Sequence, residues 1–334
     1  SSKVSLVKNN SLSQRASINR HNTSLHHRKK SSQISLPFDL IANQYDPMTP
    51  ILPRVETLTP TFKGASLTYI LQARSVIQQK ETAIITINVK GKEKLLSWSK
   101  LHGRSERIAQ ELTKNKKKIH KMAKILLWFD QDDLLEFVVS LFGCFSADMV
   151  AVPVSFDTYS LNEIIEIIKL TNSKNILISD DCYKNLENLT TNNGKLKLLK
   201  SEFFQDINFI KTNDLGTYTK AKNINNIPNI SYIEFTRTPL GKLSGVLMKH
   251  KTLENQFELF AQVLNSRNPK TKVIRPIKLS PGKTTASMAT RYTVINSLDS
   301  TRNTGLIFGL LFNIFSGNLM IHINSKYLSM SSGN

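Results

Sequence analysis

Three short apolar segments, separated by two segments of helical length, occur between residues 124 and 180. Strands are expected at residues 124–130, 150–155 and 175–180, and helices at 134–147 and 161–171. Strands that alternate with helices at this spacing are typical of a parallel sheet with crossover helices. The fold class is therefore α/β, with layered parallel or mixed sheets, and the length of 334 residues would allow roughly two domains.

The same mixture of elements continues on both sides of this unit. Residues 82–89 read as a strand, and residues 95–98 can pair back on it as a hairpin. Further helices are expected at 67–79, 99–112 and 253–264, and further strands at 232–235 and 246–249. Residues 181–230 are rich in lysine and asparagine with weak periodicity, so they are predicted to be a connection, and residues 266–290 to be a basic loop.

Residues 305–323 form the most apolar stretch near the end of the chain. A membrane span is one interpretation of its length. The polar residues Asn313, Ser316, Asn318 and His322 interrupt it, and glycines stand at positions 309 and 317. These interruptions favour a buried helix that leads into a strand.

The chain is strongly basic, with 45 Lys and Arg against 25 Asp and Glu. Residues 1–36 carry seven basic residues and no acidic one, and residues 37–60 contain five prolines. Residues 1–60 are therefore predicted to be a disordered basic tail with an extended linker. The chain starts at Ser1 without a methionine, which suggests a piece of a longer protein with further domains.

The lysine run at 114–124 has two interpretations, contact with a membrane surface or polyanion, or a solvated connecting loop, and the second is favoured. No aromatic residue interleaves the run, so stacking on a single strand is not supported, and nucleic acid is not expected as a partner. The two cysteines exclude a disulfide scaffold and suggest an intracellular location, in the cytoplasm or at an organelle surface. The seven histidines lack metal-ligand spacing, so no protein metal site is expected.

The most informative segment is residues 232–250, where a strand, a loop with hydroxyl residues and two glycines, a second strand and a helix follow one another. Hydroxyl groups and free backbone N–H groups in such a loop can hold phosphate oxygens. A plain hairpin loop explains the pattern equally well.

This segment resembles the phosphate-binding loop of the adenylate-forming superfamily, which usually reads Thr-Ser-Gly-Ser-Thr-Gly-x-Pro-Lys-Gly-Val and has a histidine five residues later. Five positions match, namely Thr236, Gly241, Gly245, Val246 and His250. The loop looks most like those of the fatty-acyl-AMP-ligase-like domains of disco-interacting protein homologues, including fungal ones. Residues 125–155 and 298–317 are also similar to superfamily segments.

The resemblance implies ATP-dependent activation of a carboxylic acid, usually a fatty acid or acyl lipid, with Mg²⁺ as the metal cofactor. It implies that Thr236, Thr238, Gly241 and Gly245 face the phosphates, with Ser244 at the place of the usual lysine. Arg302 aligns near the usual active-site histidine and could hold an anion.

The departures from the family pattern leave a second hypothesis open. Ser244 removes a positive charge, and Pro239 has neither a hydroxyl nor an N–H group. The family's later motifs and its catalytic lysine are not found in these 334 residues, so this piece alone is expected to be inactive. Residues 61–230 would form a first α/β subdomain and 231–334 the start of a second. The alternative is a non-catalytic module that binds lipid or nucleotide.

Overall fold

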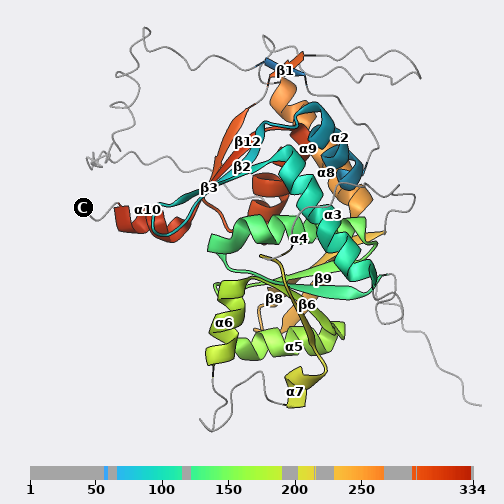
Figure 1. Cartoon of the computed structure of the whole chain (residues 1–334), viewed down its shortest axis with the longest axis vertical. Helices are drawn as coiled ribbons and strands as arrows, with labels where there is room; N and C mark the ends of the chain where they lie inside the picture. The colour runs from blue at the N-terminus through green and yellow to red at the C-terminus, as the bar shows by residue number, and fades with distance from the viewer. Residues whose placement is uncertain are drawn as a thin grey trace, which may run out of the picture. The chain divides into compact units, whose positions relative to one another are not determined.

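The computed structural model describes residues 56–58, 66–114, 122–189, 202–213, 215, 229–266, 288–290 and 292–331 (Figure 1). Most of the expected tail and linker at 1–60, namely 1–55, 59 and 60, and most of the lysine run, 115–121, lie outside these residues. The membrane-contact interpretation of that run therefore stays a prediction.

A six-stranded sheet has the order β7-β6-β4-β5-β8-β9. Its strands are β4 (Lys124–Trp128), β5 (Val150–Val154), β6 (Asn175–Ile178), β7 (Asn208–Lys211), β8 (Ile230–Arg237) and β9 (Leu243–Lys249). The first five in this order are parallel, and β9 pairs antiparallel with β8. The parallel sheet predicted from residues 124–180 is confirmed, because its strands connect through α4 (Leu134–Ser146) and α5 (Leu161–Thr171).

A second sheet of four strands has the order β11-β12-β2-β3. Its strands are β2 (Thr82–Ile87), β3 (Glu93–Ser97), β11 (Thr293–Asn296) and β12 (Leu319–Ile323). The predicted hairpin of β2 and β3 is confirmed. Parallel pairing of β2 with β12 joins segments more than 200 residues apart. Each sheet contains strands from before and after the expected subdomain boundary at 230/231, so strand pairing runs across that boundary. The division into two subdomains stays a prediction.

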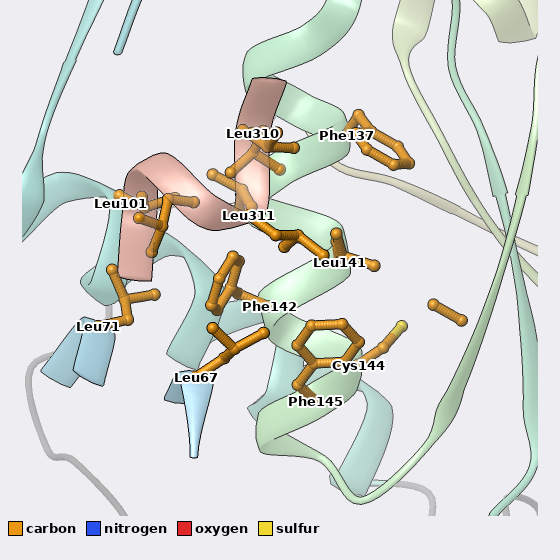
Figure 2. Close-up of a cluster of buried hydrophobic side chains, with 14 of the residues drawn as sticks. Leu67, Leu71, Leu101, Phe137, Leu141, Phe142, Cys144, Phe145, Leu310 and Leu311 are labelled. Carbon is orange, nitrogen blue, oxygen red and sulfur yellow. The ribbon is translucent and has the colours of Figure 1, made fainter. Parts of the chain in front are cut away.

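The larger apolar core surrounds α4, whose residues are almost all buried. Figure 2 shows its side chains beside those of α2 (Leu67–Ile77), α3 (Trp98–Lys114) and the segment Gly305–Leu311. The same cluster includes Ala83 and Ile84 of the four-stranded sheet and Ile125 and Leu127 of the six-stranded one. Because both of its sides are covered, α4 reads in the sequence as a nearly continuous apolar run.

A second core covers the opposite face of the six-stranded sheet. Leu126 and Trp128 of β4 point into it, alternating with the residues of β4 that face the first core. It is closed by α5, α6 (Asp180–Asn188) and α7 (Glu202–Gln205), which contribute Ile164, Ile167 and Phe204 among others. This period-two alternation is what a strand buried on both faces requires.

The prediction of a connection at 181–230 was wrong where these residues are described, and the loop predicted at 266–290 ends in a strand. Residues 181–230 contain α6, α7 and β7, and β7 forms the parallel edge of the large sheet. Helices α6 and α7 are short, so few residues carry their apolar periodicity, and the sequence pattern did not indicate them. Strand β10 (Met288–Thr290), inside the expected loop at 266–290, pairs antiparallel with β1 (Glu56–Leu58) of the expected linker.

Residues 305–323 form a buried helical segment that leads into a strand, as predicted. The π-helical segment η3 (Gly305–Leu311) continues into α9 (Phe312–Ser316), ends at Gly317 in the left-handed region, and is followed by β12. In the described part of the chain no helix has the length and apolar character needed to cross a membrane. The remaining helices are α8 (His250–Ser266), α10 (Ser325–Ser331) and the short η1 (Gln131–Asp133).

Candidate functional site

The candidate phosphate loop is the turn of the β8–β9 hairpin. Thr236 pairs with Ser244, and Arg237 pairs with Leu243. The ladder then closes with a hydrogen bond of 2.9 Å from the backbone N–H of Thr238 to the carbonyl of Lys242. The two strands therefore hold the hydroxyl residues of the loop in a fixed register.

The geometry of the turn explains why a proline stands at position 239 and a glycine at position 241. The N–H of Gly241 donates to the carbonyl of Thr238 over 2.8 Å, and Gly241 has φ of 77°. Proline at the second position and glycine at the fourth are typical of a type I turn. Pro239, a departure from the family loop, thus has a structural reason here, and a glycine at 241 avoids the cost of a left-handed side chain.

The two faces of the hairpin differ in character. Ile233, Phe235 and Leu243 point into the second core. Thr236 and Ser244 lie on the other face and are exposed, as is Gly241 in the turn. A Cβ at Gly245 would lie 3.2 Å from both Ile233 and Phe235, so Gly245 serves close packing of the hairpin on the core. The structure therefore brings Thr236, Thr238 and Ser244 together.

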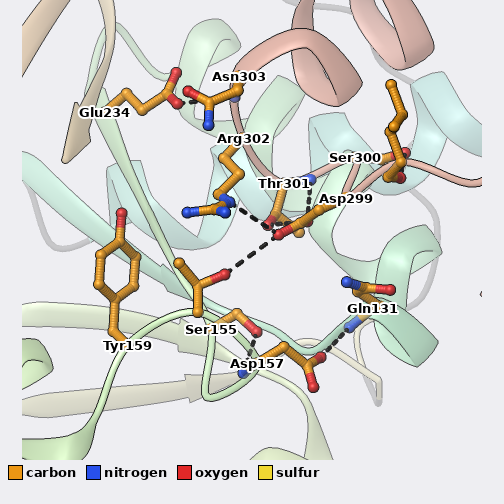
Figure 3. A network of polar contacts seen from close by, with 12 residues as sticks. Gln131, Ser155, Asp157, Tyr159, Glu234, Asp299, Ser300, Thr301, Arg302 and Asn303 are labelled. Atoms are coloured by element: carbon orange, nitrogen blue, oxygen red, sulfur yellow. Dashed lines mark hydrogen bonds and ion pairs between the residues drawn. The ribbon is translucent and has the colours of Figure 1, made fainter. Parts of the chain in front are cut away.

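Arg302 lies in the loop between β11 and η3, which reaches the hairpin from the second sheet (Figure 3). Its Nε is 3.3 Å from Asp299 Oδ2, and the same carboxylate oxygen accepts from the Thr158 hydroxyl over 3.3 Å. The next residue, Asn303, donates its backbone N–H to Glu234 Oε1 over 2.8 Å. Arg302 is thus held beside the hairpin with its charge paired, and its role in anion binding stays a prediction.

Glu234 and Tyr159 fix this junction. Burial raises the pKa of Glu234, and the N–H of Asn303 counteracts that shift. The Tyr159 hydroxyl donates to the carbonyl of Phe235 over 2.6 Å. Burial also raises the pKa of Tyr159, against which the nearby Arg302 acts. The loop of Arg302, the β5–α5 connection and the end of β8 are therefore tied together by directed bonds.

Arg237 is a residue that the sequence analysis missed. Its guanidinium donates to Glu163 Oε1 over 2.7 Å and to the carbonyl of Thr158 over 3.2 Å, and it lies over the ring of Tyr159. Glu163 also closes a capping box with Ser160 at the start of α5. The capping box is a local signal in the sequence, but nothing local links Glu163 to an arginine 74 positions away.

His250, which matches the family loop, is buried at the start of α8. Its ring meets the ring of Phe145 edge-on, and neither ring nitrogen has a hydrogen-bond partner among the described residues. Desolvation by burial lowers its pKa to about 4. His250 is therefore neutral at physiological pH and belongs to the packing behind the hairpin.

An apolar cavity of about 670 Å³ lies at the edge strand β11. It is lined by Phe260 of α8, Phe308 of η3 and Phe312 of α9, together with the residues of β11. This size and lining match the apolar sites in which small molecules bind.

The exposed hydroxyls of Thr236 and Ser244 fit the oxygens of a phosphate chain, since hydroxyl groups near a turn can donate to such oxygens. The fit to Mg²⁺ is partial. No group of three or more potential metal ligands occurs among the described residues. Magnesium is usually held by substrate phosphates and one or two carboxylates, and Glu234 is the nearest carboxylate along β8.

The sequence matches the model of the AMP-binding enzyme family over residues 72–279. The "Homeostatic regulator of DAG" of Saccharomyces cerevisiae is 52% identical over 301 residues, which are 86% of this chain and 18% of that protein. An uncharacterised protein of Schizosaccharomyces pombe is 32% identical over 255 residues, 74% of this chain and 16% of that protein. The chain therefore spans less than a fifth of the length of these relatives.

Among solved structures, the fatty acyl-adenylate ligase of Legionella pneumophila, in complex with acyl adenylate and pyrophosphate, superposes with a TM-score of 0.57. The two are 17% identical, and the match covers 80% of this chain and 41% of that one. At this identity the likeness concerns the fold alone. The expected fold, part of the large N-terminal domain of an adenylate-forming enzyme, is confirmed.

Proposed function

Because this chain belongs to the AMP-binding enzyme family, we propose that it forms the N-terminal part of a fatty-acyl-AMP-ligase-like domain in a protein of lipid metabolism. In the complete parent this domain activates a carboxylic acid with ATP. The observation that carries the proposal is the β8–β9 hairpin, which presents the hydroxyls of Thr236 and Ser244 side by side on its exposed face.

The proposed reaction is the adenylation of a fatty acid. A carboxylate oxygen attacks the α-phosphorus of ATP, the bond to the outer phosphates breaks, and pyrophosphate leaves. Catalysis of this kind rests on positioning and on charge neutralisation. The role of Thr236, Thr238 and Ser244 is to donate hydrogen bonds to phosphate oxygens, Gly241 lets the backbone turn close to them, and Gly245 sets the hairpin on the core. A bound Mg²⁺ supplies further neutralisation of phosphate charge.

The apolar cavity beside β11 is the proposed place of the acyl chain. Its lining of phenylalanine side chains favours a hydrocarbon ligand. The named relative in Saccharomyces cerevisiae is a regulator of DAG, a lipid, and the solved relative from Legionella pneumophila was found with an acyl adenylate. Both names support a fatty acid or acyl lipid as the ligand of this chain.

A second candidate function is a non-catalytic module that binds lipid or nucleotide. Two observations favour it: Ser244 replaces the usual loop lysine, and the guanidiniums of Arg237 and Arg302 are paired with Glu163 and Asp299. Less positive charge is then free to stabilise the developing charge of a transition state.

The test is fatty-acid-dependent exchange of pyrophosphate into ATP, measured on the full-length parent protein with Mg²⁺. Exchange above that of a Thr236→Val variant supports adenylation. If exchange is absent while ATP or a fatty acid still binds in calorimetry, the non-catalytic module is the correct function. Absence of both exchange and binding would contradict both candidates.

A further inference from the structure

We propose that Lys242 supplies the cation that binds the phosphate chain of ATP in this loop, two residues before the position where the family's loop has its lysine. This inference rests on the proposed function, since it names the charged group of the same site. Lys242 matches a variable position of the family loop, so the resemblance by itself assigns it no role.

The register of the hairpin places Lys242 on the same face as Ser244. Thr236 pairs with Ser244. Two positions closer to the turn, Thr238 lies opposite Lys242 and donates its backbone N–H to the carbonyl of Lys242. Directly opposed residues share a face, and successive residues alternate between faces. Thr236, Ser244, Thr238 and Lys242 therefore belong to one face of the hairpin.

The packing of the hairpin confirms this assignment of faces. The intervening residue Leu243 is buried in the second core together with Phe235. Gly245 lies against Ile233 and Phe235, on the core side. Lys242 and Ser244, one position removed from Leu243 on either side, are both exposed.

Two residues of a strand span about 7 Å. Lysine carries its ammonium group on a flexible four-carbon stem with rotatable bonds. A lysine at 242 can therefore bring its charge toward the place that a lysine at 244 would serve, without any change in the backbone.

Among the described residues, the two arginines beside the hairpin are already paired. An Nη atom of Arg237 lies 2.6 Å from Glu163, and Nε of Arg302 lies 3.3 Å from Asp299. In the part of the chain that the structure describes, no carboxylate pairs with the ammonium of Lys242. Lys242 is thus the loop cation whose charge is available to an anion.

The test compares Lys242→Gln with the matched control Lys249→Gln in the full-length parent protein. Lys249 is an exposed lysine at the other end of β9. Calorimetric titrations use ATP with Mg²⁺, inorganic pyrophosphate, and adenosine. We expect Lys242→Gln to lower the affinity for ATP and for pyrophosphate by about tenfold, which is the usual effect of losing a hydrogen bond to a charged group. Adenosine affinity and the control variant should change by less than about twofold.

A rescue variant separates the charge from its position. Adding Ser244→Lys to Lys242→Gln returns a cation to the family position, and ATP affinity should recover to within about threefold of the native value. Native ATP affinity in Lys242→Gln would overturn the role of Lys242 and leave the proposed function standing. An equal loss in Lys249→Gln would also overturn it, because general surface charge would then be responsible. If the native protein binds neither ATP nor pyrophosphate, the proposed function fails together with this inference.

Discussion

The guanidinium of Arg74 on α2 donates from its Nε to the backbone carbonyl of Ile314, 240 residues later, over 2.9 Å. Its other nitrogens bond to the carbonyl of Phe315 and to Gln78, and the side chain is 1% exposed. The last carbonyls of a helix lack partners within that helix. Arg74 satisfies two of them at the end of α9, and so attaches the C-terminal elements to the first helix of the fold.

Arg74→Met is therefore expected to destabilise the protein by about 2–4 kcal/mol, since it leaves one buried and one half-buried carbonyl without this donor. The measurement is urea unfolding followed by tryptophan fluorescence. The control is Arg107→Met, because the bond of Arg107 to Gln110 lies within the surface of α3, and this variant should cost less than about 1 kcal/mol. Equal stabilities of the two variants would contradict the role assigned to Arg74.

Gly143 marks the closest approach of α3 and α4. A Cβ at this position would clash with Cγ2 of Ile108, which is buried. Gly143→Ala should gain up to about 1 kcal/mol in helix propensity but lose about 1–3 kcal/mol from overpacking, so a net destabilisation is expected.

The paired variant Gly143→Ala with Ile108→Ala tests the cause of that loss. Truncating Ile108 removes the Cγ2 atom that the new methyl group would meet, so the double variant should be more stable than the sum of the single effects predicts. Denaturant unfolding of all four proteins gives the coupling energy. Strict additivity would mean that the two side chains do not compete for space.

The buried His250 predicts a loss of stability in acid. Its pKa is lowered to about 4 by burial, whereas in the unfolded chain it is near 6.5. The unfolded state therefore binds more protons between these values, and stability decreases as the pH falls below 6.5.

Going from pH 7 to pH 5, His250 should account for about 2 kcal/mol of lost stability. His250→Phe keeps an aromatic ring against Phe145 and removes the titration, so its stability should fall less over this range. The check is urea unfolding of both proteins at pH 7, 6 and 5. Parallel curves for the two proteins would exclude His250 as a source of acid sensitivity.

The pairing of Arg302 with Asp299 predicts a gain of anion binding when the carboxylate is neutralised. Asp299→Asn keeps an oxygen for the N–H and hydroxyl of Thr301 but removes the negative charge. We expect pyrophosphate affinity to rise by up to about fivefold, in line with the energy of a partly exposed ion pair. Calorimetry at low and high salt measures it.

Asp157→Asn is the matched control, because the ion pair of Asp157 is formed with Lys326 and that of Arg302 with Asp299. It should leave the affinity unchanged. If Asp299→Asn and Arg302→Gln both bind pyrophosphate as the native protein does, Arg302 serves only to hold its loop and has no part in the anion site.

Local patterns in the sequence determined a large part of the fold. The apolar runs at β4, β5 and β6 and the helical periods of α4 and α5 predicted a parallel sheet, because strands and helices bury their faces with different periods. A capping box of Ser160 and Glu163 is a further local signal, at the start of α5, and the structure revealed it. The spacing of threonine, proline and glycine at 236–245 predicted a turn that could present hydroxyl groups. Short elements such as α7 and β7 escaped prediction, since four residues are too few to establish a period.

Contacts between distant segments were decided only by the tertiary structure. The parallel pairing of β2 with β12 and the bonds of Arg74 at the end of α9 join segments that are far apart in the sequence. The ion pairs of Arg237 and Arg302 neutralise charges whose partners the local sequence does not identify. Such pairings depend on which surfaces remain to be buried once each element has formed, and local periodicity carries no information about them. The sequence alone therefore determined which residues stand in the candidate loop, whereas the fold decided which of its charges are paired and which remain available to an anion.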